Sequence, residues 1–534
     1  MLRAQPFLSV YLLALLLIGL GYIAIMPPFE GFDEPAHYAS LRQIADTGSI
    51  PIFGKSYLPQ DVADYGGPVA YSTLQPPFDS GLTYAKFFEN PALVARFVQE
   101  YGRPQPHPSF VPSDRPNWEA QHPPLYYLIL APLLHFVETA PLLNQILILR
   151  LASYLLALAG VFFGLEAISA AATMKGPAPA PYGFLLYPIM LPMFFPEFAR
   201  MGNDSLCLLF AGLAAYFLSR EFENERGIGW PLALGLSLGF GLLTKAFFIP
   251  ITFAIGVFLL VRCWRIADGN TRLRLRNGVV TAAIAVLVGG GWYLRSYLNY
   301  GDFSGSGDAI RIAAEGGLWA NLKQHHSLYV LARSVEVMIV TCIWAGTWSL
   351  VRMSALLYAP LIALLLMTIG AFGMRLKSTP VVRVEWLAVL LFACLFGGLL
   401  VHVIDMMEIG EGGTGGWYLH ILMPWIAPAL GLGIVVLVRR AWSRLLLAIL
   451  LCYAVLFQVM ALWAQAALFA GCAIKGGDKY YSFSGHAFCL DQAATIYNRL
   501  AIVGSPALAL LGFSGGAICA GYLALRLLRG TVPG

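Results

Sequence analysis

The strongest constraint on this chain of 534 residues is a series of long apolar stretches. The first is too long and uninterrupted for a cleaved signal peptide, and Met26, Pro27 and Pro28 follow it without a small-residue cleavage site. In all there are about twelve stretches, each near the ~20 residues that a helix needs to cross a bilayer. They cover residues 7–26, 147–172, 182–199, 205–219, 230–244, 246–262, 278–296, 355–374, 386–404, 419–438, 445–469 and 500–525. Only 12% of the residues are charged, about half the share of a soluble protein. The sequence therefore predicts an all-α polytopic membrane protein with about 12 transmembrane helices.

Three clusters of basic residues indicate how these helices are oriented. They lie in the loops 262–277, 375–383 and 439–444, and such clusters mark the cytoplasmic side. Twelve spans place all three clusters on one face, with both chain termini on that face as well. The further apolar stretches 125–137 and 331–351 then become helices that lie along, or dip into, the outer interface.

This topology divides the chain into two predicted modules. The first is a membrane module at 1–300, with a very long first external loop at 27–146. The second is a C-terminal membrane module at 301–534, with external insertions at 301–354 and 470–499.

The last external insertion contains Cys472 and Cys489. These two residues either form a disulfide, if the compartment is oxidising, or remain two unpaired thiols. We favour the disulfide.

Several function classes lack support in the sequence. The net charge of +5 comes without a basic tract interleaved with aromatics, so nucleic-acid binding is not expected. There is also no Walker A loop and no G-x-G-x-x-G motif between a strand and a helix. Nucleotide-driven transport by this chain alone is therefore not expected.

The densest group of reactive side chains follows the first apolar stretch. Glu30, Asp33, Glu34 and His37 fall within eight residues, at the membrane surface, where unpaired charge is costly. An acid before Pro35 also suits the start of a helix. Capping explains one acid but neither the second acid nor His37, so we interpret the group as functional.

A second group, at 119–127, contains His122 and the tyrosines Tyr126 and Tyr127. The tyrosines suit a membrane interface, and an anchoring role for them is as well supported as a functional one. His122 is interpreted as functional.

Three more positions carry charge on the outer side. Asp204 either caps the helix that follows it or takes part in catalysis. Lys245 lies at a tight turn, where it either reaches lipid phosphate or neutralises a substrate phosphate, and the same choice applies to Arg295.

The outer turn 405–420 forms the last group. It holds Asp405, Glu408 and Glu411, and a glycine-rich run leads to Trp417 and Tyr418. These aromatics either stack on a sugar or belong to the aromatic belt of the membrane, and the sequence slightly favours the belt.

These three groups and three single positions all fall on the outer face in this topology. Acids beside cations at a lipid–water boundary suit a substrate with its phosphate in the membrane and a polar part outside.

Short segments of the chain resemble motifs of the GT-C superfamily of membrane glycosyltransferases, in particular the bacterial lipid A aminoarabinose transferases and the protein O-mannosyltransferases. The resembling segments are Phe32 to Tyr38 (the Asp-Glu motif), His122 to Tyr127 (His-Pro-Pro-Leu-Tyr-Tyr), Asn203 to Leu206 (the second acidic loop) and Leu243 to Lys245 (Leu-Thr-Lys). Pro28 to His37 and Trp292 to Asp302 also resemble uncharacterised bacterial membrane proteins related to these enzymes. The similarity covers about the first 300 residues. The segment 40–118 and the absence of a sizeable soluble C-terminal domain depart from the pattern and leave the acceptor open.

The resemblance implies transfer of a sugar from a polyprenyl-phosphate-linked donor to an envelope glycan, lipid or protein acceptor. The protein would then lie in the cell inner membrane, in contact with membrane lipids, with its active site facing the periplasm. Asp33 would act as the general base of one inverting displacement. Lys245 and Arg295 would stabilise the leaving phosphate.

The resemblance also implies supporting roles for the other residues. Glu34 and Asp204 would orient the acceptor or a divalent metal, with His37 or His122 assisting. Some family members need a metal and others do not, so Asp33, Glu34 and Asp204 are candidate metal ligands only.

Two other function classes compete with this one. A transporter or flippase for a lipid-linked or anionic solute predicts ionisable residues near the bilayer midplane. Glu166 is the best such residue, but it lies near the inner end of its stretch. A non-catalytic scaffold predicts no clustering of acids beside an apolar groove.

Overall fold

The structure is a computed structural model, and it describes residues 6–70, 77–79, 81–104, 109–172, 180–266, 269–314, 316–317, 320, 328–408, 415–439, 441–473 and 487–528. Within these residues, ten helices are long and apolar enough to cross a membrane. They are α1 (Pro6–Ile25), α7 (Leu142–Ala172), α10 (Asp204–Glu223), α12 (Phe248–Arg265), α13 (Thr271–Tyr300), α17 (Ala355–Leu376), α18 (Val384–Glu408), the continuous pair η3 (Gly416–Leu422) and α19 (Met423–Leu437), α20 (Ala441–Phe469) and α22 (Pro506–Leu528). The predicted all-α polytopic architecture is confirmed, whereas the number of twelve spans is not.

Two of the predicted spans differ from the ten in length. The stretch 182–199 is divided into α8 (Ala180–Met190) and α9 (Phe194–Ala199), because Pro192 lacks the backbone N–H that a continuous helix needs. The stretch 230–244 forms α11 (Gly229–Leu242), which has 14 residues. At 1.5 Å per residue this helix is about 21 Å long, shorter than the hydrocarbon core of a bilayer.

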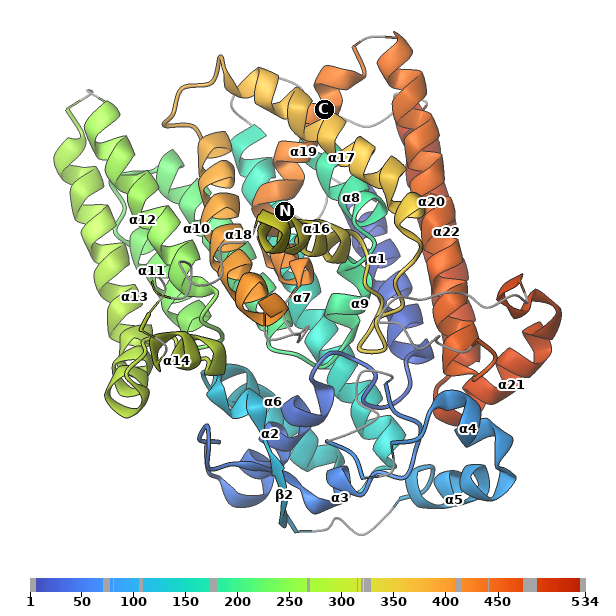
Figure 1. The fold of residues 1–534 in the computed structure, drawn as a ribbon. Coiled ribbons are helices and arrows are strands. Elements are labelled where there is room, and N and C mark those ends of the chain that lie inside the picture. The colour runs from blue at the N-terminus through green and yellow to red at the C-terminus, as the bar shows by residue number, and fades with distance from the viewer. Residues whose placement is uncertain are drawn as a thin grey trace.

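The two ambiguous apolar stretches are also helical. They form α6 (Leu125–Val137) and α16 (Leu328–Ile343). In Figure 1, α16 runs across the direction of α20 and α22 rather than parallel to them.

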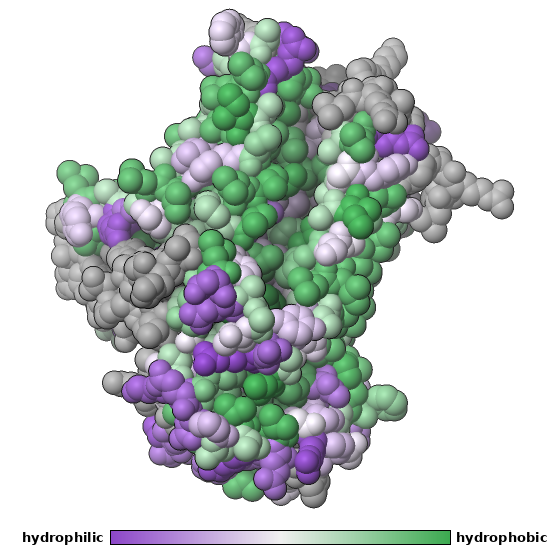
Figure 2. Space-filling view, turned by 90° about the vertical axis from the view of Figure 1, so that its right-hand side faces the viewer, coloured by the Kyte–Doolittle hydropathy of each residue, from purple (hydrophilic) through white to green (hydrophobic). Residues whose placement is uncertain are grey.

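The segment between α1 and α7 forms a compact cap at one end of the helical bundle (Figure 1). Its strands pair antiparallel, with Tyr57 opposite Pro116 and Pro59 opposite Pro112. Figure 2 shows hydrophilic side chains gathered at this end, whereas hydrophobic ones cover much of the rest of that face. Its elements are α2 (Glu34–Thr47), β1 (Tyr57–Pro59), α3 (Gln60–Ala63), α4 (Tyr84–Glu89), α5 (Pro91–Tyr101), β2 (Pro112–Pro116) and η2 (Trp118–Gln121).

The C-terminal part of the chain packs directly on the N-terminal helix. The predicted span 500–525 begins in α21 (Ala493–Val503), and Pro506 then opens α22, which lies along α1. Gly512 permits this close approach, since a Cβ atom there would lie 2.6 Å from the carbonyl oxygen of Leu17. The two predicted modules, 1–300 and 301–534, thus share one packed core.

Two further short elements complete the described part of the fold. α14 (Gly307–Ala314) follows α13, and η4 (Ala487–Gln492) leads into α21. Cys472 and Cys489 form a disulfide with their Cα atoms 6.4 Å apart, which ties the end of α20 to η4.

Candidate active site

Asp33 lies where the chain leaves α1 and enters α2. It occupies the N-cap position of α2 with φ 59°, a left-handed conformation, and its side chain caps no backbone N–H. This conformation is costly for a residue with a Cβ atom, by about 1–2 kcal/mol. The Asp33 carboxylate instead accepts a hydrogen bond from Nε1 of Trp118, at 2.9 Å. The surrounding structure therefore holds this carboxylate away from the capping geometry that the sequence also permits.

The adjacent acid, Glu34, has a different environment. Its two oxygens accept hydrogen bonds from Arg150 at 2.8 and 2.6 Å, and from the backbone N–H groups of Met201 and Gly31 at 3.0 and 3.1 Å. Arg150 also donates to the carbonyl oxygens of Met26 and Pro27. Glu34 and Arg150 are both buried, so this ion pair locks the end of α1, the start of α2 and the loop before α10 together.

A second ion network contacts the backbone at Phe32, the residue before Asp33. Arg200 donates to Glu197 at 2.6 Å, to Asp204 at 2.7 Å and to the carbonyl oxygen of Phe32 at 3.1 Å. The Lys245 ammonium is 3.0 Å from both carboxylate oxygens of Asp204. All four charged residues are buried, and Arg200 connects them to the residue that precedes Asp33.

The predicted histidines meet at a carboxylate that the sequence analysis did not assign to the site. Glu119 lies 3.4 Å from Nε2 of His37 and 3.1 Å from Nε2 of His122. The other ring nitrogen of His37 lies 3.0 Å from the hydroxyl of Tyr127. Burial of the His37 ring lowers its pKa to about 3, although the Glu119 carboxylate acts in the opposite direction. His37 is therefore neutral at pH 7.

The pKa of Asp33 is shifted towards neutral pH. Burial and the nearby Glu119 carboxylate raise it to about 6, while Arg200, the hydrogen bond from Trp118 and Lys245 limit the rise. A carboxylate with a pKa near 6 is ionised at pH 7 and remains basic enough to accept a proton.

Aromatic side chains from the C-terminal part of the chain complete this region. Trp417 stacks on Phe32 with ring centroids 4.4 Å apart. The Lys245 ammonium lies 4.3 Å from the ring centroid of Tyr418 and 4.6 Å from that of Phe247. Trp417 and Tyr418 thus belong to the same cluster as Asp33 and Lys245.

The remaining predicted residues lie elsewhere or act structurally. In the described part of the chain, the charged group of Arg295 contacts the ring of Trp292, at 4.8 Å, and no member of the cluster. The hydroxyl of Tyr126 hydrogen-bonds to Ser153, at 2.7 Å. Of the outer turn 405–420, Glu411 lies outside the described residues, and Asp405 pairs with Arg311 on α14.

The candidate metal ligands Asp33, Glu34 and Asp204 lie in different environments. Among the described residues, no group of three or more His, Cys, Asp or Glu side chains is arranged to hold a metal ion. Glu34 faces the guanidinium of Arg150, and Asp204 faces Arg200 and Lys245. Two of the three proposed ligands are thus neutralised by side-chain cations. The third, Asp33, accepts a hydrogen bond from the neutral indole of Trp118 instead.

Four charged residues of this cluster were not predicted from the sequence: Glu119, Arg150, Glu197 and Arg200. Arg150 is a lone cation at the start of an apolar helix, which is a detectable signal for a buried ion pair. Glu197, Arg200 and Asp204 are spaced for ion pairs along one helical face. Glu119 precedes His122 by three residues, but its contact with His37 has no signal in the sequence.

Comparison with known proteins supports the predicted resemblance. Residues 121–289 match the family of dolichyl-phosphate-mannose-protein mannosyltransferases. This region includes His122, Asp204 and Lys245, whereas Asp33 precedes it. Among curated proteins the sequence has no match.

Three solved structures are similar to the chain at low identity. ArnT from Cupriavidus metallidurans in the apo state has 13% identity and a TM-score of 0.44, and the match covers 97% of this chain and 78% of that one. The same protein bound to undecaprenyl phosphate has 13% identity and a TM-score of 0.46, with coverages of 99% and 79%. The Archaeoglobus fulgidus oligosaccharyltransferase in the apo form has 14% identity and a TM-score of 0.39, with coverages of 98% and 56%.

The family match extends over about a third of the chain and includes five of the predicted site residues, namely His122, Tyr126, Tyr127, Asp204 and Lys245. Over residues 121–289 this protein is therefore similar to the dolichyl-phosphate-mannose-protein mannosyltransferases, and its predicted resemblance to the GT-C membrane glycosyltransferases is confirmed.

Proposed function

We propose that this protein transfers a sugar from a polyprenyl-phosphate-linked donor to an acceptor, by a single inverting displacement at the Asp33 cluster. The proposed location is the inner membrane, with both termini in the cytoplasm and the cap of residues 34–121 in the periplasm. The family match supports a lipid-phosphate sugar donor, because that family is named for dolichyl-phosphate-mannose. The acceptor is a glycan, a lipid or a protein of the envelope.

The single observation that carries this proposal is the contrast between Asp33 and the acids around it. Glu34 and Asp204 are each held by side-chain cations at 3.0 Å or less. Among the hydrogen bonds of the described residues, the carboxylate of Asp33 accepts one, from the neutral indole of Trp118, while its backbone carbonyl accepts from Ala36 and His37 in the first turn of α2. It is also the only one of these three acids that is not fully buried. This is the environment that a general base requires.

In the proposed reaction, the acceptor hydroxyl or amine gives its proton to Asp33 as its lone pair attacks the anomeric carbon of the sugar. The bond between that carbon and the phosphate oxygen breaks, and its electron pair leaves with the polyprenyl phosphate. Lys245 stabilises the negative charge that develops on this phosphate. The Lys245 ammonium has three N–H donors, and its two contacts with Asp204 use at most two of them. At least one N–H can therefore donate to a phosphate oxygen.

The other members of the cluster position these two groups. The Glu34–Arg150 pair fixes the backbone on which Asp33 lies, and Arg200 fixes Phe32 beside it. Trp417 stacks on Phe32, the residue before Asp33, and both rings are buried, so this pair packs the chain next to the proposed base. His37 and His122 flank Glu119, and the Glu119 carboxylate raises the pKa of the nearby Asp33.

The test is a transfer assay in proteoliposomes with radiolabelled polyprenyl-phosphate sugars. Asp33→Asn keeps the shape of the side chain but removes the base, so we expect transfer to fall by about 10²–10⁴-fold. Asp64→Asn, in an exposed acid of the same cap, is the matched control and should retain the wild-type rate.

Two results would contradict the proposal. Full activity of folded Asp33→Asn would remove the base from the mechanism. Passage of a solute across the bilayer, with no transfer from any donor, would favour the transporter class instead.

A further inference from the structure

A second polar region lies at the opposite end of α10 from the Asp33 cluster. α10 begins at Asp204 and has 20 residues, so Glu223 at its other end is about 30 Å away along the helix. A pocket of about 430 Å³ opens there. Its lining comes from the ends of three apolar helices, α10, α12 and α13: Phe222, Glu223, Asn224, Glu225, Arg226, Arg262, Ile266, Asn270, Leu273 and Arg274.

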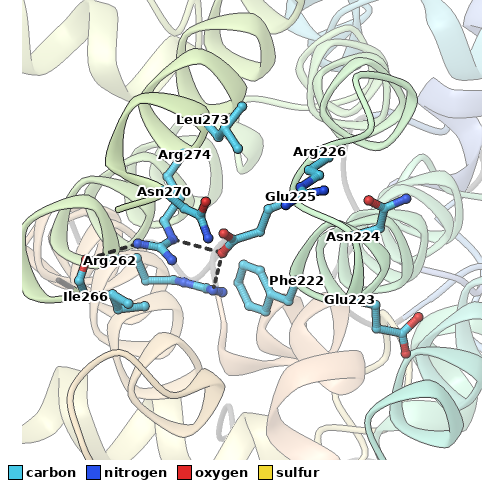
Figure 3. A pocket seen from close by; sticks show the side chains of 10 residues that line it. All are labelled: Phe222, Glu223, Asn224, Glu225, Arg226, Arg262, Ile266, Asn270, Leu273 and Arg274. Atoms are coloured by element: carbon cyan, nitrogen blue, oxygen red, sulfur yellow. Dashed lines mark hydrogen bonds and ion pairs between the residues drawn. The ribbon is translucent and has the colours of Figure 1, made fainter. Parts of the chain in front are cut away.

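The lining of this pocket contains more cations than acids, namely three arginines and two glutamates. Figure 3 shows Glu225 between Arg262 and Arg274, and the same carboxylate oxygen lies 3.3 Å from Arg262 and 2.8 Å from Arg274. One carboxylate oxygen therefore serves two guanidinium groups. Arg226 adds a third cation, and its side chain is exposed. Glu223, the other acid of the lining, is paired with Arg220 at 2.9 Å.

The backbone adds to this attraction for an anion. α13 starts at Thr271, and its first turn lines the pocket through Leu273 and Arg274. A helix N-terminus carries partial positive charge, which favours a phosphate at this position. Arg262 is held rigidly in the wall, because its guanidinium lies 3.4 Å from the ring centroid of Phe222.

The pocket also lies at the level of the membrane surface. Trp264, in the last turn of α12, is 84% exposed, and Leu275 and Val279 on α13 are at least half exposed. A tryptophan and apolar side chains exposed at a helix end are typical of the boundary between lipid headgroups and acyl chains. The anion available at that boundary is the phosphate of a lipid headgroup.

We propose that this pocket binds the phosphate of an anionic phospholipid, in the leaflet opposite to the Asp33 cluster. Arg226 and Arg262 contact the phosphate, and the first turn of α13 faces it. The glycerol end of the lipid lies towards Leu273 and Ile266, which together with Phe222 are the apolar residues of the lining.

Native mass spectrometry of the intact protein, released from nanodiscs of phosphatidylcholine and phosphatidylglycerol, tests this site. We expect one phosphatidylglycerol to be retained in preference to phosphatidylcholine. Arg226→Gln should weaken that retention by about tenfold, which corresponds to the loss of one charge-assisted contact. Glu223→Gln removes an acid from the lining and should strengthen it.

Arg272→Gln is the matched control, since Arg272 is an exposed cation in the same turn of α13 but does not line the pocket. It should leave retention unchanged. Equal weakening by Arg226→Gln and Arg272→Gln would overturn the proposal, because it would indicate diffuse attraction to a basic surface.

A second arm separates the lipid from a free anion. Inorganic phosphate, added to protein in phosphatidylcholine nanodiscs, should raise the unfolding midpoint less than phosphatidylglycerol does. A shift with inorganic phosphate alone, and none with phosphatidylglycerol, would overturn the lipid assignment.

Discussion

Charged side chains cluster at both ends of α10, but they are buried and paired at one end and line a solvent-accessible pocket at the other. At the Asp204 end, Arg200, Lys245 and their carboxylate partners are buried and face one another. At the Glu223 end, cations outnumber acids around a pocket, and Arg226 is exposed. Burial requires charge to be balanced locally, whereas a solvated pocket can retain an excess of one sign. The same residue types therefore form a rigid, charge-balanced site at one end and a surface that attracts anions at the other.

The largest effect should come from breaking a buried pair at the first end. Glu34→Ala leaves the guanidinium of Arg150 buried without its carboxylate, so we expect the free energy of unfolding to fall by about 3–5 kcal/mol. Thermal unfolding of the purified protein in detergent measures this loss. Glu100→Ala, which breaks the exposed pair with Arg96, is the control and should shift the midpoint little.

A double variant sharpens the same comparison. Replacing Glu34 by Gln and Arg150 by Met removes both charges, so part of the stability lost in Glu34→Ala should return. If the double variant is less stable than Glu34→Ala, then the hydrogen bonds of the pair stabilise the fold beyond the mutual neutralisation of its two charges.

The next effect concerns the phosphate end of the proposed reaction. Lys245→Met removes the ammonium but keeps an unbranched side chain between Tyr418 and Phe247. We expect kcat to fall by about 10²–10³-fold, as for the loss of one group that stabilises charge in a transition state. Arg295→Met should have no comparable effect, since Arg295 lies against Trp292 outside the cluster. Equal losses in both variants would contradict the placement of the phosphate beside Lys245.

A smaller effect is expected from pH. With a pKa of about 6, Asp33 is mostly ionised at pH 7 and mostly protonated at pH 5, so kcat/KM should fall about tenfold over this range. The pH profile of the transfer assay measures this limb. His37 has a pKa of about 3 and stays neutral throughout, so His37→Gln should keep a limb near pH 6. If the fall in kcat/KM near pH 6 disappears in His37→Gln, the titrating group would be the histidine and not Asp33.

The smallest effect should occur at the Glu223 end. Arg220→Ala breaks a partly exposed ion pair with Glu223, and such pairs contribute about 0–1 kcal/mol. Unfolding midpoints at low and high salt should therefore differ little between this variant and the wild type. A loss as large as that of Glu34→Ala would show that the two ends do not differ in the way their burial suggests.

Much of the architecture was predictable because the position of a membrane helix depends on the apolar content and the prolines of one short stretch of sequence. The apolar stretch that ends at Met26-Pro27-Pro28 predicted α1, since proline ends a helix. The same rule accounts for the break between α8 and α9 at Pro192, which the apolar content of 182–199 concealed. The short motifs around Asp33, His122, Asp204 and Lys245 were also visible, because each is contiguous in the sequence.

The roles within those motifs were not readable from the sequence. Asp33 and Glu34 are neighbours of the same chemistry, and both precede Pro35 closely enough to suit a helix start. Only the packed structure separates them, because the partner of Glu34 lies 116 residues away at Arg150 and the partner of Asp33 lies 85 residues away at Trp118.

Hydropathy and motif spacing are properties of short segments, so they are enough to predict a polytopic helical membrane protein and the order of its reactive motifs. The tertiary structure decided which charges meet. It brought Trp417 to Phe32 and Glu119 to both histidines, and it left Arg295 outside the cluster. The physical reason is that ion pairs and ring contacts depend on distances of a few ångströms between side chains, and these distances are set by how the helices pack.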